Sequence, residues 1–410
     1  MTNSSSNRLR RRLVLAGGAG IAAAGLGGFS RAAIAQRTSL DLPVANGHRN
    51  LVAFPEKRPL IVLTTRPPQL ETPFEVFNDG LITPNDAFFV RYHNAGIPTS
   101  VDADKHVIKI GGNAAGKPFD LTMADLRTQF KPVELVAVNQ CSGNSRALFD
   151  PRVTGGQLTN GAMGNARWVG VPLKDILARA EVKSTAKQVT FDGLDLALLG
   201  GGDFVKALDI NHATNGEVMI AYRMNGADLP MLNGYPVRLV VPGYYGTYWV
   251  KHLSEIQVVD QVFDGFWMKP AYRIPDNACA CVEPGTAPAA TRPIGRFNVR
   301  SFITSVSDGA RVNAGSPLAV RGIAFDGGQG IREVAWSADG GRSWREAVLG
   351  AELGRFSFRE FTFGFTPQAG THDLRVRAFN RSGESQPMEA LWQPAGYMRN
   401  VVESVKVMAS

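Results

Sequence analysis

The stretch LVAVNQCSGNSR, residues 135–146, decides the fold class and much of the chemistry of this 410-residue chain. Residues 135–138 are apolar and strand-forming, and Cys141 follows them in a small polar loop that contains Gly143. A cysteine in such a loop is well placed to reach a pocket, where its thiolate acts as a nucleophile or a metal ligand. Taken alone, a buried and inert cysteine explains the pattern better. The choice therefore depends on the surrounding segments.

Residues 85–284, which surround this stretch, mix short strands with short helices. The pattern predicts strands at 135–138, 188–191, 237–241 and 256–259, and helices at 122–129 and 173–180. Strand and helix do not alternate regularly, as they do in a doubly wound sheet. We therefore expect an α+β domain, in a chain long enough for two or three domains.

Two further motifs in this region carry charge. In FFVRYHN, residues 88–94, Arg91 and His93 are two apart on an extended segment and point to the same side, which suits a small oxyanion. A solvated surface pair explains them equally well. In GYPVRLVVPGYYG, residues 234–246, and the following WVKHL, a glycine-rich aromatic loop lets backbone amides approach a phosphate or pterin edge. Arg238 and Lys251 add positive charge there, although glycine-rich loops alone are weak evidence.

The first 35 residues are predicted to be a signal peptide. NRLRRR at 7–12 precedes an apolar, glycine-rich run at 13–29 and a small-residue cleavage site at 33–35. The pair Arg11 and Arg12 is typical of a twin-arginine signal, which exports folded proteins to the periplasm. A membrane anchor is the alternative, but the run is short and rich in glycine. We expect no membrane span after cleavage.

Charge and cysteine content exclude several classes of protein. Removing residues 1–35 takes away five arginines and no acids, so the formal net charge falls from +8 to 8 − 5 = +3. The mature chain therefore gives no argument for binding nucleic acid. Three cysteines exclude a disulfide scaffold. A bridge between Cys279 and Cys281 would be strained, so we expect two free thiols or an unusual tight loop.

Both ends of the chain differ from its middle. Residues 36–84 are rich in proline and predict an extended arm. PGTAPAATRPIG, residues 284–295, excludes regular structure and indicates a linker at 285–297. Beyond it, alternating strands at 299–305, 318–324, 331–337 and 372–379 predict an immunoglobulin-like β-sandwich over 298–410. Such sandwiches commonly dimerise or dock a partner.

The ordered combination of motifs resembles the sulfite oxidase family over roughly residues 85–400. The motifs are FFVRYHN, QCSGNSR, GAMGNARWVGVPLKDIL, AYRMNG, NGYPVRLVVPGYYG, VKHL, a late Tyr272 and SADGGRSW. Several independent motifs in one order make the resemblance specific. It implies an α+β molybdopterin domain that holds one molybdenum on a pyranopterin dithiolene, followed by the sandwich.

The resemblance also implies roles for individual residues. Cys141 matches the metal-binding cysteine, and three residues match positions around the oxyanion site: Arg91, His93 and Arg146. Tyr272 matches the active-site tyrosine. Residues that match cofactor-contacting positions are Arg91, His93, Arg238 and Lys251, together with His212 and Asn233, where the alignment is loose.

Two departures from the family bear on the substrate site. Ala395 occupies a position where animal relatives carry an arginine, and Ala271 replaces the aspartate before the tyrosine. We therefore expect anion binding that is weaker or differently organised.

The implied function is a periplasmic sulfite dehydrogenase that passes electrons to a c-type cytochrome. Cys279-Ala280-Cys281 is not a C-x-x-C-H haem motif, so we expect no haem on this chain. The cytochrome is then a permanent subunit in a heterodimer, or a transient carrier that meets a homodimer. The alternatives are a periplasmic sulfoxide reductase, which typically lacks the sandwich, and a nitrate reductase, which adds haem and flavin domains. A non-catalytic binding protein with a degenerate cofactor domain is the alternative from another class.

Overall fold

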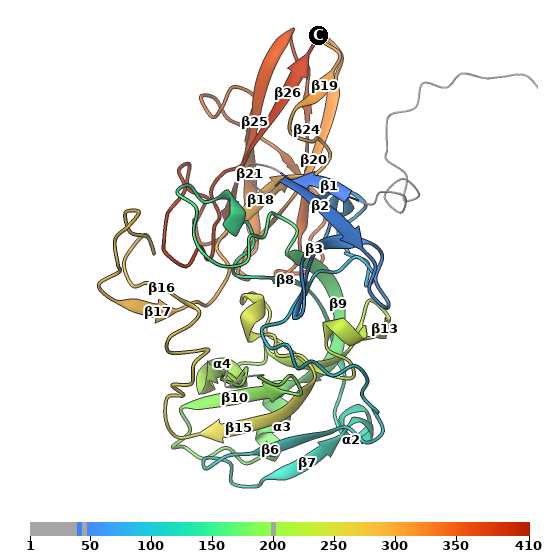
Figure 1. Ribbon diagram of the computed structural model, residues 1–410, viewed down its shortest axis with the longest axis vertical. Coiled ribbons are helices and arrows are strands. Elements are labelled where there is room, and N and C mark those ends of the chain that lie inside the picture. Colours follow the sequence, from blue (N-terminus) through green and yellow to red (C-terminus); the bar gives the residue numbers. More distant parts are fainter. Residues whose placement is uncertain (1–38, 43–46, 198–201) are drawn as a thin grey trace, which may run out of the picture. The chain divides into compact units, whose positions relative to one another are not determined.

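The computed structural model describes residues 39–42, 47–197 and 202–410. The predicted signal peptide, residues 1–35, lies outside the described residues. Within the described ranges, no helix is both long enough and apolar enough to cross a membrane. Strands dominate and the helices are few and short (Figure 1), so the expected α+β class is confirmed.

Residues 36–84, predicted to be an extended arm, form paired strands where the structure describes them. Five strands pair in chain order into one antiparallel sheet: β1 (Ser39–Leu42), β2 (Gly47–Val52), β3 (Leu60–Thr65), β4 (Pro68–Glu71) and β5 (Val90–Arg91). Leu60, Leu70, Val90 and Tyr92 pack into a small core of their own. The extended arm was predicted without this pairing, because prolines, which lie mainly at strand ends and turns, obscured the strand pattern. The sheet ends in Arg91.

Two sheets and three short helices make up the next region. One sheet has the order β11-β10-β15-β6-β7, of which Figure 1 labels the last four strands. The other has the order β13-β12-β9-β8, with β14 paired to β12. The strands are β6 (Val107–Gly111), β7 (Phe119–Thr122), β8 (Val133–Gln140), β9 (Met163–Pro172), β10 (Gln188–Gly193), β11 (Lys206–Asp209), β12 (Met219–Met224), β13 (Ala227–Asp228), β14 (Arg238–Val240) and β15 (Leu253–Val259). The helices are α2 (Met123–Thr128), α3 (Leu173–Arg179) and α4 (Ile210–Thr214), and short 3-10 turns include η2 (Phe74–Asn78).

The strands and helices predicted for this region are confirmed. The predicted strands correspond to β8, β10, β14 and β15, and the predicted helices to α2 and α3. The hydroxyl of Thr122 accepts from the backbone N–H of Asp125, and the Asp125 carboxylate accepts from the Thr122 N–H, so a capping box starts α2. The central strand β9 was missed, because it is largely buried and shows little alternation of polar and apolar residues.

The C-terminal region is a two-sheet sandwich, as predicted. One sheet contains β18 (Arg300–Ile303), β20 (Leu318–Phe325), β24 (Arg359–Phe365) and β23 (Val348–Leu349). The other contains β19 (Ala310–Val312), β26 (Ser404–Ala409), β25 (Gly370–Asn380), β21 (Ile331–Ser337) and β22 (Arg345–Glu346). Val320, Val334, Leu374 and Val407 form its core, whereas Phe302, Phe325 and Phe358 belong to the main core. The sandwich therefore shares apolar packing with the preceding region.

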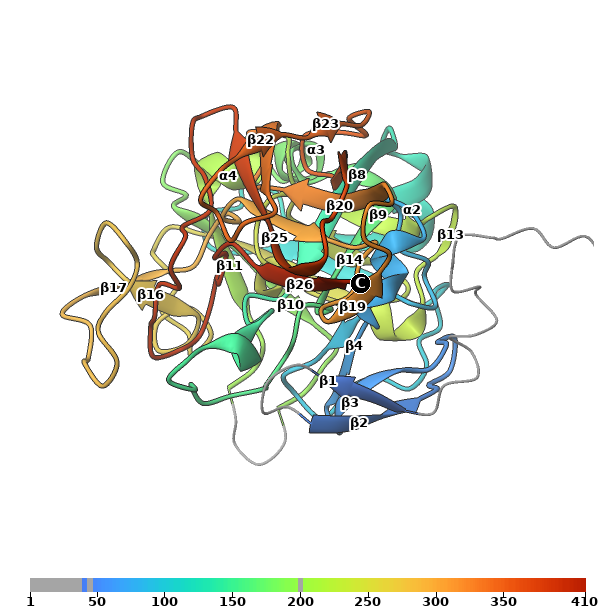
Figure 2. The ribbon, with the colours of Figure 1, turned by 90° about the horizontal axis from the view of Figure 1, so that it is seen from above.

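The predicted linker contains one short strand. β17 (Thr291–Pro293) pairs with β16 (Arg273–Pro275), and Figure 2 shows this hairpin at one side of the ribbon. The expectation of no regular structure at 285–297 is therefore wrong at these three residues. The pairing partner precedes the linker, so the composition of the linker itself gives no signal of the pairing.

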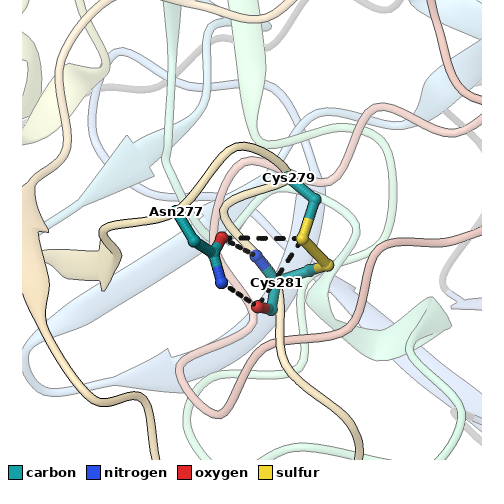
Figure 3. Close-up of a disulfide and its surroundings, with 3 residues drawn as sticks. All are labelled: Asn277, Cys279 and Cys281. Atoms are coloured by element: carbon teal, nitrogen blue, oxygen red, sulfur yellow. Dashed lines mark hydrogen bonds between the residues drawn. A yellow bond between two sulfur atoms is a disulfide. The ribbon is translucent and has the colours of Figure 1, made fainter.

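Cys279 and Cys281 form a disulfide in a tight loop (Figure 3). Ala280 lies between them at φ 51°, and the two Cα atoms are 5.1 Å apart, within the range that disulfides span. The side chain of Asn277 closes the loop by donating to the Cys281 carbonyl at 2.8 Å and accepting from its N–H at 3.2 Å. The tight-loop alternative is thus confirmed, and the expectation of two free thiols is wrong.

Candidate active site

A cavity lies where β5, the end of β8 and β14 meet the loops that follow them. Seven of the nine predicted site residues line it: Arg91, His93, Cys141, Asn233, Arg238, Lys251 and Tyr272. The sequence places these residues up to 181 positions apart, and the strand ends bring them together. The cavity is therefore the candidate active site.

Cys141 lies one residue beyond β8 and is the free cysteine of the chain. Its backbone N–H donates to the Ala162 carbonyl at 2.9 Å, and its carbonyl accepts from the Asn144 N–H at 3.0 Å. The Asn144 side chain in turn accepts from the Ala162 N–H at 2.9 Å. The loop is therefore fixed on both sides, and the thiol, in a residue only 8% exposed, lines the cavity.

Buried cations form one wall of the cavity. Arg238, on β14, donates to the carbonyls of Asn233 at 2.8 Å and Trp249 at 3.0 Å. Lys251 donates to the Arg91 carbonyl at 2.5 Å, and its Nζ lies 3.7 Å from the centroid of the Tyr92 ring. Burial lowers the pKa of Arg238 to about 10 and that of Lys251 to about 7. Buried cations that bond mainly to carbonyls and rings suit an anionic ligand.

Asp195 and Lys57 complete this charge pattern. Asp195 also lines the cavity, and burial raises its pKa while the nearby Lys251 opposes the rise. Lys57 donates to the Asn233 side chain at 2.5 Å and to the Phe88 carbonyl at 3.0 Å, and burial lowers its pKa to about 7. Lys57 was not predicted from the sequence, because it lies 176 positions from Asn233 and in no recognised motif.

His93 and Tyr272 form a hydrogen-bonded pair through Nε2 and the phenol oxygen. The His93 ring stacks on Phe204 at 4.2 Å between centroids and lies 4.8 Å from Trp267. Burial, together with the neighbouring cations Arg91 and Lys251, holds the pKa of His93 well below its usual value, so the imidazole is neutral. Burial raises the pKa of Tyr272, so its hydroxyl keeps its proton. The pair is positioned to hold or pass one proton.

Arg146 lies beside this pair without lining the cavity itself. It begins the turn η3 (Arg146–Leu148), and its Nε donates to the Ala395 carbonyl at 3.1 Å. The guanidinium carbon lies 4.9 Å from the centroid of the Tyr397 ring, which stacks on Tyr272 at 5.2 Å. The Met398 N–H donates to the Ser142 carbonyl at 2.8 Å. Residues 395–398, which follow the sandwich strand β25, therefore hold the arginine next to the site.

The structure does not bring His212 to the cavity. His212 lies on α4, with Nε2 3.5 Å from a Glu217 carboxylate oxygen and its ring 4.3 Å from that of Tyr244. In contrast to His212, two 3-10 turns reach the cavity: η5 (Gly246–Tyr248) through Gly246 and Thr247, and η4 (Met231–Asn233) through Asn233.

His252 supports the cavity wall from behind. Its Nδ1 donates to the Tyr235 carbonyl at 2.6 Å, so the neutral ring accepts at Nε2 from the Tyr92 hydroxyl, also at 2.6 Å. Burial lowers the pKa of His252 to about 3, which agrees with the neutral form. Of the motif VKHL, Lys251 was predicted to contact the cofactor and does line the cavity, whereas the supporting role of His252 was not predicted.

Polar atoms without partners indicate that the cavity is built for a polar ligand. Asn139 Oδ1, Ser142 Oγ, Thr247 Oγ1 and Arg238 Nε are buried in cavity-lining residues and have no hydrogen-bond partner within the protein. Such atoms are costly unless a ligand satisfies them. At Gly246 a Cβ would lie 2.4 Å from Asn139 Oδ1, so a side chain there would disturb this wall. The donor set, a thiol with cations and unpaired amide and hydroxyl groups, fits a metal carried on an anionic heterocyclic cofactor.

Comparison with known proteins gives the same result. Residues 94–267 match the family described as oxidoreductase molybdopterin binding domain, and residues 291–410 match the Mo-co oxidoreductase dimerisation domain. Mitochondrial sulfite oxidase of Homo sapiens is 31% identical over 377 residues, which cover 87% of this chain and 67% of that protein. Sulfite oxidase of Arabidopsis thaliana is 30% identical over 383 residues, covering 87% of this chain and 96% of that protein.

Among solved structures, the sulfane dehydrogenase SoxCD from Paracoccus pantotrophus superposes with a TM-score of 0.73 at 25% identity. The match covers 83% of this chain and 84% of that one. A match of that extent must include parts of both the cavity-bearing region and the sandwich.

Proposed function

The chain belongs to the sulfite oxidase family of molybdenum-cofactor oxidoreductases, and from this we propose that it oxidises sulfite to sulfate and passes the electrons to a c-type cytochrome. The observation that carries the proposal is the single cavity that holds the Cys141 thiol, the cationic wall and the His93–Tyr272 pair. Sulfite and water give sulfate, two protons and two electrons. The site must therefore bind an anion, accept electrons and release protons.

The residues divide between holding the cofactor and handling the substrate. The bound molybdenum cofactor supplies the two-electron redox centre. Cys141 is the proposed thiolate ligand, because it is the free cysteine and lines the cavity. Asn233, Arg238 and Lys251 are proposed to hold the anionic pterin and its phosphate by charge-assisted hydrogen bonds.

The other residues in the cavity and beside it are proposed to act on sulfite. Arg91 and Arg146 bind its oxygens, since both guanidinium groups bond within the protein mainly to backbone carbonyls. Tyr272 and His93 hold and pass on a proton, since they are hydrogen-bonded to each other and the imidazole is neutral. Tyr397 closes this end of the site by stacking on Tyr272.

We also propose the cellular context. Export by the predicted twin-arginine signal, residues 1–35, would place the mature protein in the periplasm, where c-type cytochromes are available. Residues 291–410 match a dimerisation domain, which supports a dimer through the sandwich predicted for 298–410. A sulfane sulfur is the second candidate substrate, because the structural relative is named a sulfane dehydrogenase.

The deciding experiment measures reduction of ferricytochrome c by the purified mature protein with sulfite as the sole electron donor. We expect sulfite-dependent reduction, about one molybdenum per chain and no haem absorption band. Reduction with thiosulfate but not with sulfite would favour the sulfane substrate. Reduction of a sulfoxide by a reduced dye, without sulfite oxidation, would favour the reductase. A protein without molybdenum would contradict the proposal altogether.

A further inference from the structure

Lys206 is a buried lysine next to the site that no motif included. It begins β11, is 1% exposed, and its ammonium donates to the Trp267 carbonyl at 2.5 Å. Its Nζ lies 4.8 Å from the centroid of the Tyr248 ring and 4.9 Å from that of Tyr272. Among the described residues, no carboxylate lies within ion-pair distance of it. The ammonium is thus held by one carbonyl and two aromatic faces.

Folding alone does not explain a charge at this position. Burying an ammonium without a carboxylate partner is costly, and cation–π contacts return only part of that cost. An unbranched apolar side chain such as methionine, which is one atom shorter, would fill most of the space without that penalty. A residue that opposes stability in this way is commonly retained for what it does at a neighbouring site.

The neighbouring site here is the His93–Tyr272 pair. Lys206 contacts the Tyr272 ring directly, and it fixes the backbone of Trp267, whose ring lies 4.8 Å from that of His93. Its charge also acts on His93, whose proton affinity it lowers together with Arg91, Lys251 and Arg146. The Lys206 side chain therefore contacts both Tyr272 and Trp267, and its positive charge lowers the proton affinity of His93.

We propose that Lys206 is a positioning residue that holds Tyr272 by its ammonium and makes the His93–Tyr272 pair release protons readily. The inference rests on the proposed function, because sulfite oxidation produces two protons that must leave the site. A proton that the pair takes up from the reaction passes on to solvent, and a positive charge beside the pair favours that departure.

The pH range of the effect follows from the pKa of Lys206. The titratable groups around its ammonium are Tyr248, Tyr272 and His93. Burial lowers the pKa of Lys206 to about 7, so the ammonium is charged below about pH 7 and neutral well above it. Its charge is therefore present where His93 takes up a proton, at the acid side of the profile. Loss of the charge raises the pKa of His93, so the pair keeps its proton up to a higher pH.

The test compares the pH profile of kcat for sulfite in the molybdenum-loaded wild type, Lys206→Met and Lys206→Arg. We expect Lys206→Met to move the acid limb of kcat upward by about one pH unit, which is about a tenfold loss on that limb. Near pH 8.5 its kcat should approach that of the wild type. Lys206→Arg keeps the charge and should keep the wild-type acid limb. Lys206→Gln is a second neutral variant, with a polar amide in place of the ammonium, in case methionine disturbs the fold.

Lys183→Met is the matched control, because this exposed lysine also donates to a backbone carbonyl, at 3.0 Å, but belongs to no part of the site. It should leave the profile unchanged. If the wild type is active and both Lys206→Met and Lys206→Gln have the same acid limb as the wild type, this inference alone is overturned. Equal displacement of the limb in Lys206→Arg also overturns it, because the charge would then be irrelevant. A wild type that does not turn over sulfite overturns the proposed function, and this inference with it.

Discussion

Gly396→Ala is expected to weaken sulfite binding by displacing Arg146. Gly396 has φ 60°, and a Cβ there would lie 2.4 Å from Val153 Cγ2 and 2.9 Å from Arg146 Cγ. Contacts that short cannot persist, and the long unbranched side chain of Arg146 can shift further than the β-branched side chain of Val153. The left-handed conformation itself costs alanine about 1 kcal/mol of stability. If the displaced guanidinium loses a charge-assisted bond to sulfite, binding weakens by about 1.5–3 kcal/mol, or roughly 10- to 150-fold in KM.

The assay is steady-state reduction of cytochrome c over a range of sulfite concentrations, with thermal unfolding measured in parallel. Arg146→Gln should raise KM by a similar factor, and the double variant should match Arg146→Gln alone, because Gly396 acts through the arginine. Gly226→Ala is the matched control: its φ is 83°, but nothing lies within 4 Å of its added Cβ. A wild-type KM in Gly396→Ala, or additive effects in the double variant, would refute this reasoning.

Three further predictions concern single residues. Cys141→Ser should abolish sulfite oxidation at nearly unchanged thermal stability, because a hydroxyl is a harder and far less acidic ligand than a thiol. Cys279→Ser should keep activity and metal content. Normal turnover of Cys141→Ser would show that Cys141 is not a ligand of the metal. Tyr272→Phe keeps the ring but loses the bond to His93, so kcat should fall at a nearly constant KM, and an unchanged kcat would exclude a role in proton handling. Thr122→Ala removes the capping box of α2 and should cost about 1 kcal/mol in urea unfolding with wild-type kinetics; an equal stability would show that the cap contributes nothing.

The sequence predicted those parts of the fold that are encoded locally. The apolar run before Cys141 indicated β8, and alternation with turn residues indicated the strands of the sandwich. Ordered motifs were specific enough to indicate the family and seven residues that meet in one cavity. These signals survive in a single sequence because strand period, capping and loop chemistry depend on neighbours a few positions apart.

Tertiary structure alone decided which distant residues join or leave the site. Lys57 reaches Asn233 across 176 positions, and Lys206 reaches the Tyr272 ring from another strand, with no local pattern that marks either lysine. His212 was predicted near the cofactor, but α4 places it beside Glu217 instead. The proline-rich segment before residue 84 became a sheet only because its strands pair with one another and with β5. Strand pairing and the burial of charged side chains depend on contacts between segments far apart in the chain. Such contacts have no period or spacing that a sequence displays.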